Sequence, residues 1–327
     1  MTSPTLEQVY ANPIFMALNQ SGKHFMEARF LEPRMNPFFT HNLIHVAALT
    51  LRGIPHLKAL PALQMMLEDF KSGLYAGKHT LVVDSSGNTA HAAVRLAQAF
   101  GLEVKVVLAA DVPANKKELL AALSPKKIIA VGKGESVSEC AKEEAQRPGH
   151  IHMNQYTHMG NVHAHEFYTG PEVFHTLFHA RIGIIAVAMG SGGTVAGVGR
   201  YLKRECPGAI VLGVRPKLGE QVPGARDRKR MAEVVTLPWE EVVDDVVEVS
   251  RKDAFVATRE LWAAVEPQPG PTSGMAWKGL MSYLEAQDDE SLEKLRGKCA
   301  AFLCPDSATL YSGVMIAELD TGQGFVS

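Results

Sequence analysis

The sequence predicts an α/β protein of two lobes, each a mostly parallel sheet flanked by helices. From residue 78 onward, short apolar strands alternate with helical segments, and glycine and proline lie in the turns between them. The strands are apolar along nearly their whole length, which is typical of parallel strands buried on both faces. The 327 residues, 46% of them hydrophobic, are enough for two medium domains or one large one.

The first lobe is predicted from three strand–helix pairs. Strands are expected at residues 78–84, 104–110 and 126–132, where short apolar runs end in turns. A helix follows each strand, at residues 88–100, 115–123 and 136–146. The first of these helices carries an apolar face, formed by Ala92, Ala93, Leu96, Ala97 and Phe100.

The second lobe repeats the pattern after residue 180. Strands are expected at residues 182–188 and 209–216, and a helix that passes through residues 201–203 connects them. A polar, histidine-rich stretch at residues 146–165 marks a weak break before this lobe.

Composition limits the classes of partner. A net charge of -2 argues against nucleic acid or an acidic membrane as the main partner. The four scattered cysteines form no Cys-x-x-Cys pair, which favours a reduced setting. The first residues lack the basic start and apolar run of a signal peptide, and no apolar run approaches the ~18 residues that span a membrane. We therefore expect a cytoplasmic protein with no membrane partner.

Two turns stand where a predicted strand ends and a helix begins. One is Asp84-Ser85-Ser86-Gly87-Asn88-Thr89, and the other is the glycine turn at residues 190–194. Ligands of parallel sheets bind at the carboxyl ends of the strands, and helix N-termini attract anions. We expect the first turn to bind a substrate carboxylate and the second a phosphate.

Lys58 completes a set that suits pyridoxal phosphate. It precedes Ser86 by 28 positions, and the glycine turn follows about a hundred residues later. The aldehyde of the cofactor needs a lysine amine to form a Schiff base, and its ring hydroxyl needs a short amide side chain. Its phosphate needs a loop of free backbone N–H groups.

Four motifs in register resemble the cysteine synthase and cystathionine β-synthase family, which has the type II fold of pyridoxal-phosphate enzymes. That family carries S-V-K-D-R, T-S-G-N-T-G, G-T-G-G-T-x-T-G and G-x-S-x-G. In this chain they correspond to His56-Leu57-Lys58-Ala59-Leu60, Ser85-Ser86-Gly87-Asn88-Thr89-Ala90, Gly190-Ser191-Gly192-Gly193-Thr194-Val195-Ala196-Gly197 and Gly270-Pro271-Thr272-Ser273-Gly274. Residues 154–170 also resemble the family's segment that leads to T-G-P-E.

The resemblance implies a role for each matched residue. Lys58 would form the Schiff base and move the α-proton, Asn88 would bond the ring hydroxyl, and Thr272 would meet the pyridine nitrogen. The phosphate would be bound by Gly190, Ser191, Gly192, Gly193 and Thr194. The substrate would be bound by Ser85, Ser86, Gly87, Thr89 and Gln155.

The implied activity is β-replacement on an activated L-serine. O-acetylserine or O-phosphoserine would give cysteine or another β-substituted alanine through an aminoacrylate intermediate. The alternatives are a β-eliminating lyase of the same fold, and a catalytically silent relative that binds the cofactor or a partner protein. The resemblance also implies a homodimer, a small amino-acid donor, a small nucleophile and no metal. It places the cofactor in a cleft between a lobe at residues 56–160 and a lobe made of residues 1–55 and 161–327.

Three departures from the family pattern stand out. Ala59-Leu60 replaces the family's Asp-Arg. Ala90-His91 replaces the glycine that follows the asparagine loop, residues 85–89. Residues 38–55 read as an apolar insertion with helical spacing, which would need cover from a second subunit. These features favour a nucleophile other than sulfide, such as an amine or a larger thiol.

Each motif also has a plainer interpretation. The asparagine loop, or Thr272 before Met275, could simply cap a helix, and the glycine turn could be a tight turn. The pairs His150/His152 and His163/His165 could suggest a metal, but no carboxylate or cysteine stands at ligand spacing. The basic run at residues 226–230 is either a solvated helix start or a means of attracting an anionic substrate.

Overall fold

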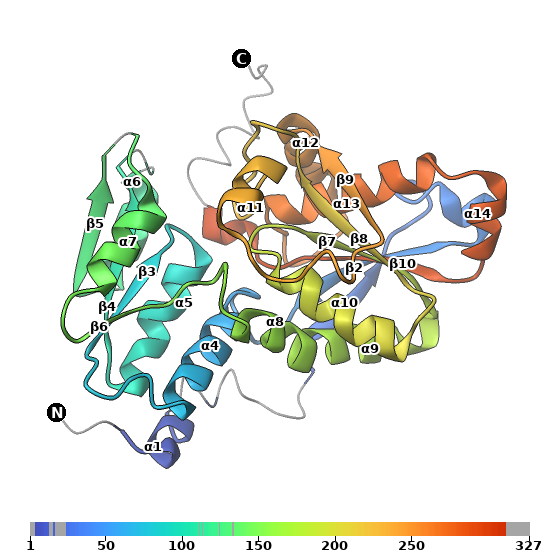
Figure 1. The fold of residues 1–327 in the computed structure, drawn as a ribbon. Coiled ribbons are helices and arrows are strands. Elements are labelled where there is room, and N and C mark those ends of the chain that lie inside the picture. The colour runs from blue at the N-terminus through green and yellow to red at the C-terminus, as the bar shows by residue number, and fades with distance from the viewer. Residues whose placement is uncertain are drawn as a thin grey trace. The chain divides into compact units, whose positions relative to one another are not determined.

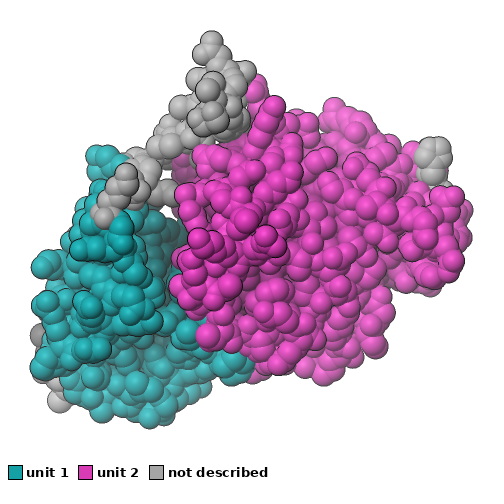
Figure 2. All heavy atoms as spheres, turned by 45° about the horizontal axis from the view of Figure 1, so that its top comes forward, with its two compact units in different colours: residues 1–23, 58–164 teal, residues 24–57, 165–327 magenta. Residues whose placement is uncertain are grey.

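The computed structural model describes residues 4–12, 16, 24–110, 112, 114–123, 125–132 and 134–311. They form two compact units: unit 1 holds residues 1–23 and 58–164, and unit 2 holds residues 24–57 and 165–327. Figure 2 colours them teal and magenta.

Unit 1 is built on a parallel four-stranded sheet (Figure 1). Its strands lie in the order β5-β4-β3-β6, with bounds Lys127–Val131, Glu103–Ala109, Thr80–Asp84 and His150–His152. Its α-helices are α1 (Leu6–Tyr10), α4 (Ala59–Lys71), α5 (Asn88–Ala97), α6 (Ala114–Ala122), α7 (Val137–Ala145) and α8 (Gly160–Ala164). The 3₁₀ turn η1 (Gln98–Phe100) extends α5. The three predicted strand–helix pairs are all present.

Both faces of this sheet are covered, which explains the continuous apolar strands. Leu81 and Val83 of β3 face one cluster, which also contains apolar residues of α4 and α5. Val82 between them faces a second cluster with Ala141 of α7. Alternate residues of one strand therefore meet opposite layers.

Unit 2 is built on a six-stranded sheet. The order is β1-β2-β10-β7-β8-β9, with bounds Met26–Phe30, His45–Leu51, Cys299–Leu303, Ile182–Ala188, Ile210–Pro216 and Asp245–Val249. Only the pairing of β1 with β2 is antiparallel among the described strands. The α-helices are α3 (Phe38–Asn42), α9 (Gly170–Leu177), α10 (Gly193–Glu205), α11 (Arg228–Val234), α12 (Arg251–Leu261), α13 (Pro271–Glu285) and α14 (Asp289–Lys294). Shorter turns are the π-helical η2 (His165–Thr169) and the 3₁₀ turns η3 (Phe178–Ala180) and η4 (Ala308–Tyr311).

The interpretation of residues 38–55 as an apolar insertion with helical spacing is wrong. Only α3 is helical there, and residues 45–51 form β2, which pairs with β1 on one side and β10 on the other. Val46, Ala47, Ala48, Leu49 and Thr50 are buried within unit 2. The stretch is therefore part of the sheet and needs no second subunit to cover it.

The amino-terminal residues also differ from expectation. The sequence analysis grouped residues 1–55 with the carboxy-terminal lobe, and residues 24–57 do belong to unit 2. The described residues around α1 belong to unit 1, because Val9 is buried in the cluster that covers one face of its sheet. No helix in the described part of the chain is long and apolar enough to cross a membrane.

Candidate active site

The asparagine loop, which is expected to bind the substrate, lies at the carboxyl end of β3 in unit 1. β3 ends at Asp84, and Gly87 is the N-cap of α5, so the loop leads directly into the helix. Gly87 makes no side-chain cap bond, and its N–H donates to Ser85 Oγ at 3.3 Å. The asparagine loop therefore does not cap α5 with a side chain, and the start of α5 is a helix N-terminus of the kind at which anions bind.

Gln155 is brought to this loop from a segment 66 residues away. The Thr89 hydroxyl donates to Gln155 Oε1 at 2.8 Å, and both side chains are buried. The Asn161 amide holds the Gln155 carbonyl at 2.6 Å. Thus the five loop and glutamine residues expected to bind a carboxylate lie together within unit 1.

Lys58 is the N-cap residue of α4 and is half-buried. Ala59 and Leu60, which replace the family's charged pair, are 3% and 2% exposed. The first turn of α4 therefore meets an apolar core, and two charges could not be placed there without a large desolvation cost. The same burial shows that these two residues do not border an open entrance.

The glycine turn of unit 2 connects β7 to α10. Gly192 is the N-cap of α10 with φ 79°, a left-handed conformation that favours glycine. At Gly190, a Cβ atom would collide with the Gly224 carbonyl oxygen. Ser191, Gly192 and Gly193 are buried at the start of this 13-residue helix, a position at which backbone N–H groups favour anions.

Thr194 of this turn is held by a buried histidine that the sequence analysis did not assign to the site. Its Oγ1 lies 3.1 Å from His165 Nε2, and His165 Nδ1 lies 2.9 Å from Thr169 Oγ1. His165 and Thr169 belong to the π-helical turn η2, and both are 0% exposed. The sequence signal is the histidine before T-G-P-E, which the sequence favours as polar lining or ordinary surface over a metal ligand.

Thr272 is the second residue of α13 and is 4% exposed. Its Oγ1 atom is buried, and no described residue gives it a hydrogen bond. The N-cap of α13 is Gly270, without a side-chain cap bond, so Thr272 does not cap this helix. A buried hydroxyl without a hydrogen-bond partner lowers the stability of the fold unless a ligand forms that hydrogen bond.

Comparison with known proteins identifies the family. The family model described as "Pyridoxal-phosphate dependent enzyme" matches residues 57–296. The chain belongs to this family. The resemblance stated from the motifs is thereby confirmed, and the cofactor is pyridoxal 5'-phosphate.

Individual relatives and solved structures are also similar to this chain. Cysteine synthase B of Escherichia coli (strain K12) is 26% identical over 235 residues, which is 71% of this chain and 77% of the relative. The structure of an O-ureido-L-serine synthase has a TM-score of 0.78 at 20% identity, covering 94% of this chain and 96% of that one. A hydrogen sulfide-producing enzyme from Fusobacterium nucleatum has a TM-score of 0.76 at 20% identity, covering 90% and 97%. The two structures show the fold, and the expected α/β fold is confirmed.

The residues present fit the family's cofactor. The chain offers a lysine amine at Lys58, an amide at Asn88, a glycine turn with buried N–H groups, and a neutral buried hydroxyl at Thr272. Each of the two units contributes part of this set.

The histidine pairs are engaged within the protein. His152 Nε2 lies 3.2 Å from Asp84 Oδ1, and His163 Nδ1 lies 2.9 Å from Glu68 Oε1. His150 Nδ1 lies 2.8 Å from the Glu144 carbonyl. Among the residues that the structure describes, no group of three potential metal ligands is found.

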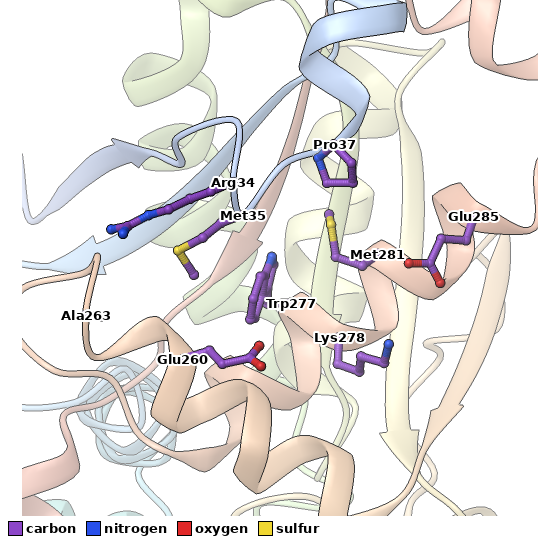
Figure 3. A pocket seen from close by; sticks show the side chains of 9 residues that line it. All are labelled: Arg34, Met35, Pro37, Glu260, Ala263, Trp277, Lys278, Met281 and Glu285. Atoms are coloured by element: carbon purple, nitrogen blue, oxygen red, sulfur yellow. The ribbon is translucent and has the colours of Figure 1, made fainter.

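A pocket of about 490 Å³ in unit 2 lies apart from the residues expected at the active site. Figure 3 shows Arg34 and Met35 on one side of Trp277, and Met281 and Glu285 on the other. Trp277 follows Thr272 by five positions in α13, but no predicted site residue lines the pocket. The pocket and the cofactor residues therefore use different parts of the same helix.

Proposed function

We propose that this enzyme catalyses β-replacement on an activated L-serine. The observation that carries the proposal is the buried hydroxyl of Thr272, which stands where the family meets the pyridine nitrogen. A neutral hydroxyl leaves that nitrogen unprotonated and weakens the electron sink. This favours elimination and replacement at Cβ over transamination. The similarity to cysteine synthases supports the same chemistry.

The cofactor would be held by the residues that match the family's motifs. Lys58 would bind it covalently, Asn88 would donate to its ring hydroxyl, and Thr272 would donate to its ring nitrogen. Its phosphate would be bound by Gly190, Ser191, Gly192, Gly193 and Thr194. The buried N–H groups at the start of α10 support this assignment, because they face an anion without a competing side chain. When bound, the cofactor withdraws electrons from Cα of the amino acid.

The substrate carboxylate would be bound at the start of α5. Ser85, Ser86, Gly87, Thr89 and Gln155 would surround it, and backbone N–H groups at this helix N-terminus would donate to its oxygens. Thr89 and Gln155 already hold each other at 2.8 Å, so little side-chain entropy remains to be lost on binding.

Lys58 would also move the proton. Its Nζ, released when the amino acid takes its place, would accept the α-proton as a general base. The leaving group would then depart from Cβ, and a nucleophile would add there. A neutral hydroxyl at Thr272 and a lysine base are enough for both halves of the reaction.

The first test of the proposal is Lys58→Ala. We expect it to lose the visible absorption band of the bound cofactor and all turnover, because no other amine would stand at the aldehyde. The matched control is Lys71→Ala, an exposed lysine in the last turn of the same helix. A lysine–cofactor adduct that borohydride still traps elsewhere in the chain of the Lys58 variant would contradict the assignment.

The product identifies the reaction class. Purified protein is mixed with O-acetylserine, O-phosphoserine or serine, the absorption spectrum is followed, and a panel of sulfide, organic thiols and amines is then added. β-Replacement predicts a new amino acid with at least one nucleophile. Pyruvate and ammonia as the sole products would make the chain a lyase, and the absence of any spectral change would indicate a catalytically silent relative.

The burial of the residues that depart from the family pattern favours an ordinary nucleophile. Ala59, Leu60 and His91 are buried within unit 1, and residues 45–51 are a strand of unit 2. None of these features marks an entrance for a second substrate. We therefore propose sulfide or a simple thiol as the first nucleophiles to test.

We further propose a cytoplasmic homodimer. The four cysteines form no disulfide, which supports a reducing compartment. Phe30 of the edge strand β1 and Leu43 after α3 are 54% and 43% exposed, and they offer apolar area for a second subunit. Light scattering that shows a monomer at micromolar concentration would contradict the dimer.

A further inference from the structure

A short segment after β10 is paired on both of its sides. Asp306 forms an isolated antiparallel bridge with His56, and the Leu57 N–H donates to the Pro305 carbonyl at 2.7 Å. On the opposite side, Ser307 bridges Pro269. Residues 305–307 therefore act as a small strand between two other segments of unit 2.

The two flanking segments lead directly to residues assigned to the cofactor. The residue after Leu57 is Lys58. Gly270 is the N-cap of α13, two positions before Thr272, and its N–H donates to the Asp306 carbonyl at 3.2 Å. Residues 305–307 thus hold the chain just before Lys58 and just before Thr272.

The carboxylate of Asp306 strengthens this arrangement. The Tyr311 hydroxyl donates to Asp306 Oδ2, and Oδ1 lies against the α-carbon of Gly270, where a Cβ atom would collide with it. Asp306 is only 8% exposed. Its negative charge at the N-terminus of the 15-residue α13 is stabilised by the helix dipole.

The charge of the Asp306 carboxylate also affects the pKa of a neighbouring thiol. Burial raises the pKa of the Cys304 thiol to about 12, and the Asp306 carboxylate, two positions along the chain, adds to the increase.

We propose that Asp306, held by Tyr311, is a positioning residue that fixes the Thr272 hydroxyl and the backbone before Lys58 for the cofactor. It touches neither the substrate nor the cofactor and acts through Gly270 and the bridge to His56. The inference rests on the proposed function, because the roles of Lys58 and Thr272 come from it.

Tyr311→Phe tests this with the smallest change. It removes the hydroxyl that donates to the Asp306 carboxylate, and hydrogen bonds to charged groups correspond to roughly tenfold or more in an equilibrium constant. We expect the dissociation constant of the cofactor, measured by titrating the cofactor-free protein, to rise about tenfold and the absorption maximum of the bound cofactor to shift. Turnover number should fall while the KM for the donor stays unchanged, because the substrate loop lies in unit 1.

Three further variants separate a positioning role from a general loss of rigidity. Tyr283→Phe removes a half-buried hydroxyl later in the same helix and should leave cofactor affinity within about twofold of wild type. Asp306→Asn can still accept from Tyr311, so it should recover part of the affinity that Asp306→Ala loses. Wild-type affinity and spectrum in both Tyr311→Phe and Asp306→Asn would overturn the inference, as would equal losses in Tyr283→Phe. If the wild-type protein itself forms no visible adduct with pyridoxal phosphate, the proposed function has failed instead.

Discussion

At the scale of single residues, burial separates the motifs that carry chemistry from ordinary packing. Thr272 keeps a buried hydroxyl without a partner in the described chain, whereas Ala59 and Leu60 fill a core. The sequence motifs lead to the proposal of Lys58, Asn88 and the glycine turn as cofactor residues, because their types and order are restrictive. The motifs did not identify Asp306 or Tyr311 as partners, because such contacts arise from packing between distant segments and leave no local pattern.

Gly192 is the residue whose replacement should most weaken the phosphate site. Any side chain there would strain a backbone with φ 79°, and its Cβ would lie 3.1 Å from Trp239 Cδ1. In Gly192→Asp a negative charge would also face the phosphate. We expect cofactor affinity to fall by about 2 kcal/mol or more, because the variant adds bulk and a like charge beside a dianion.

Dialysis followed by the cofactor absorbance measures this loss. The control is Gly208→Asp, where the added Cβ would meet no atom within 4 Å and φ is not in the left-handed range. Full cofactor retention in the Gly192 variant would show that the phosphate binds elsewhere.

His91 gives a prediction on pH. Burial, with a smaller effect of Arg95, lowers the pKa of this histidine in α5 below its ordinary value of 6.5. The unfolded chain then binds more protons than the folded one below about pH 6.5. The neutral imidazole therefore contributes fully to the free energy of unfolding above that pH, and this contribution is lost as the pH falls.

Urea unfolding of the wild type and of His91→Gln between pH 7.5 and 5 measures the effect. The wild type should lose stability relative to the variant as the pH falls below 6.5, by at most about 1.4 kcal/mol per pH unit. Parallel pH profiles for the two proteins would show that His91 titrates alike in the folded and unfolded chain.

At the scale of elements, apolar periodicity predicted most strands and helices but failed at residues 38–55. Residues 46–49 are apolar without interruption, and such a run fits a buried strand and a buried helix equally well. The strand conformation is stabilised by pairing with β1 and β10. These strands lie beside β2 in space but up to 254 residues away in the chain, as in the pair Cys299–His45. Local sequence cannot contain that information.

The start of α4, which carries Lys58, depends on how the rest of that helix is anchored. Asp69 Oδ1 lies 2.9 Å from His158 Nε2, and Glu68 Oε1 lies 2.9 Å from His163 Nδ1, so two carboxylate–imidazole contacts connect α4 to the segment around α8. Asp69 is 7% exposed. Asp69→Ala should therefore lower the free energy of unfolding by about 1–3 kcal/mol.

The comparison is Glu290→Ala, which removes an exposed pair with Lys294 whose side chains are 80% and 69% exposed. Exposed pairs contribute about 0–1 kcal/mol, so this variant should remain close to wild type. Thermal or urea denaturation provides both values, and equal changes in the two variants would mean that the Asp69 pair does not anchor the helix.

At the scale of the whole molecule, the sequence predicted two α/β units but placed one boundary wrongly. The polar stretch at residues 146–165 does contain the end of unit 1, at residue 164. The passage of the chain from unit 1 to unit 2 at residue 24, and back at residue 58, has no compositional break. Val9 and β2 reach their units through packing, which short-range patterns do not report.

Charge at this scale leads to a prediction on the donor. The net charge of -2 would disfavour a dianionic donor unless positive charge is concentrated locally. The basic run at residues 226–230 provides that concentration beside the glycine turn. The Arg226 N–H donates to the Met189 carbonyl at 3.0 Å, and Gly224 lies against Gly190.

We therefore expect Arg226 to favour O-phosphoserine over O-acetylserine. Arg226→Ala should lower kcat/KM for O-phosphoserine by roughly tenfold or more, the effect of losing one charge-assisted hydrogen bond, and for the uncharged ester by less than about twofold. Arg228→Ala, an exposed cation at the start of α11, is the matched control and should affect both donors little. The preference should also weaken as salt is added, because screening acts on the charged donor. An equal loss for both donors in the Arg226 variant would show that this residue supports the loop and does not select the leaving group.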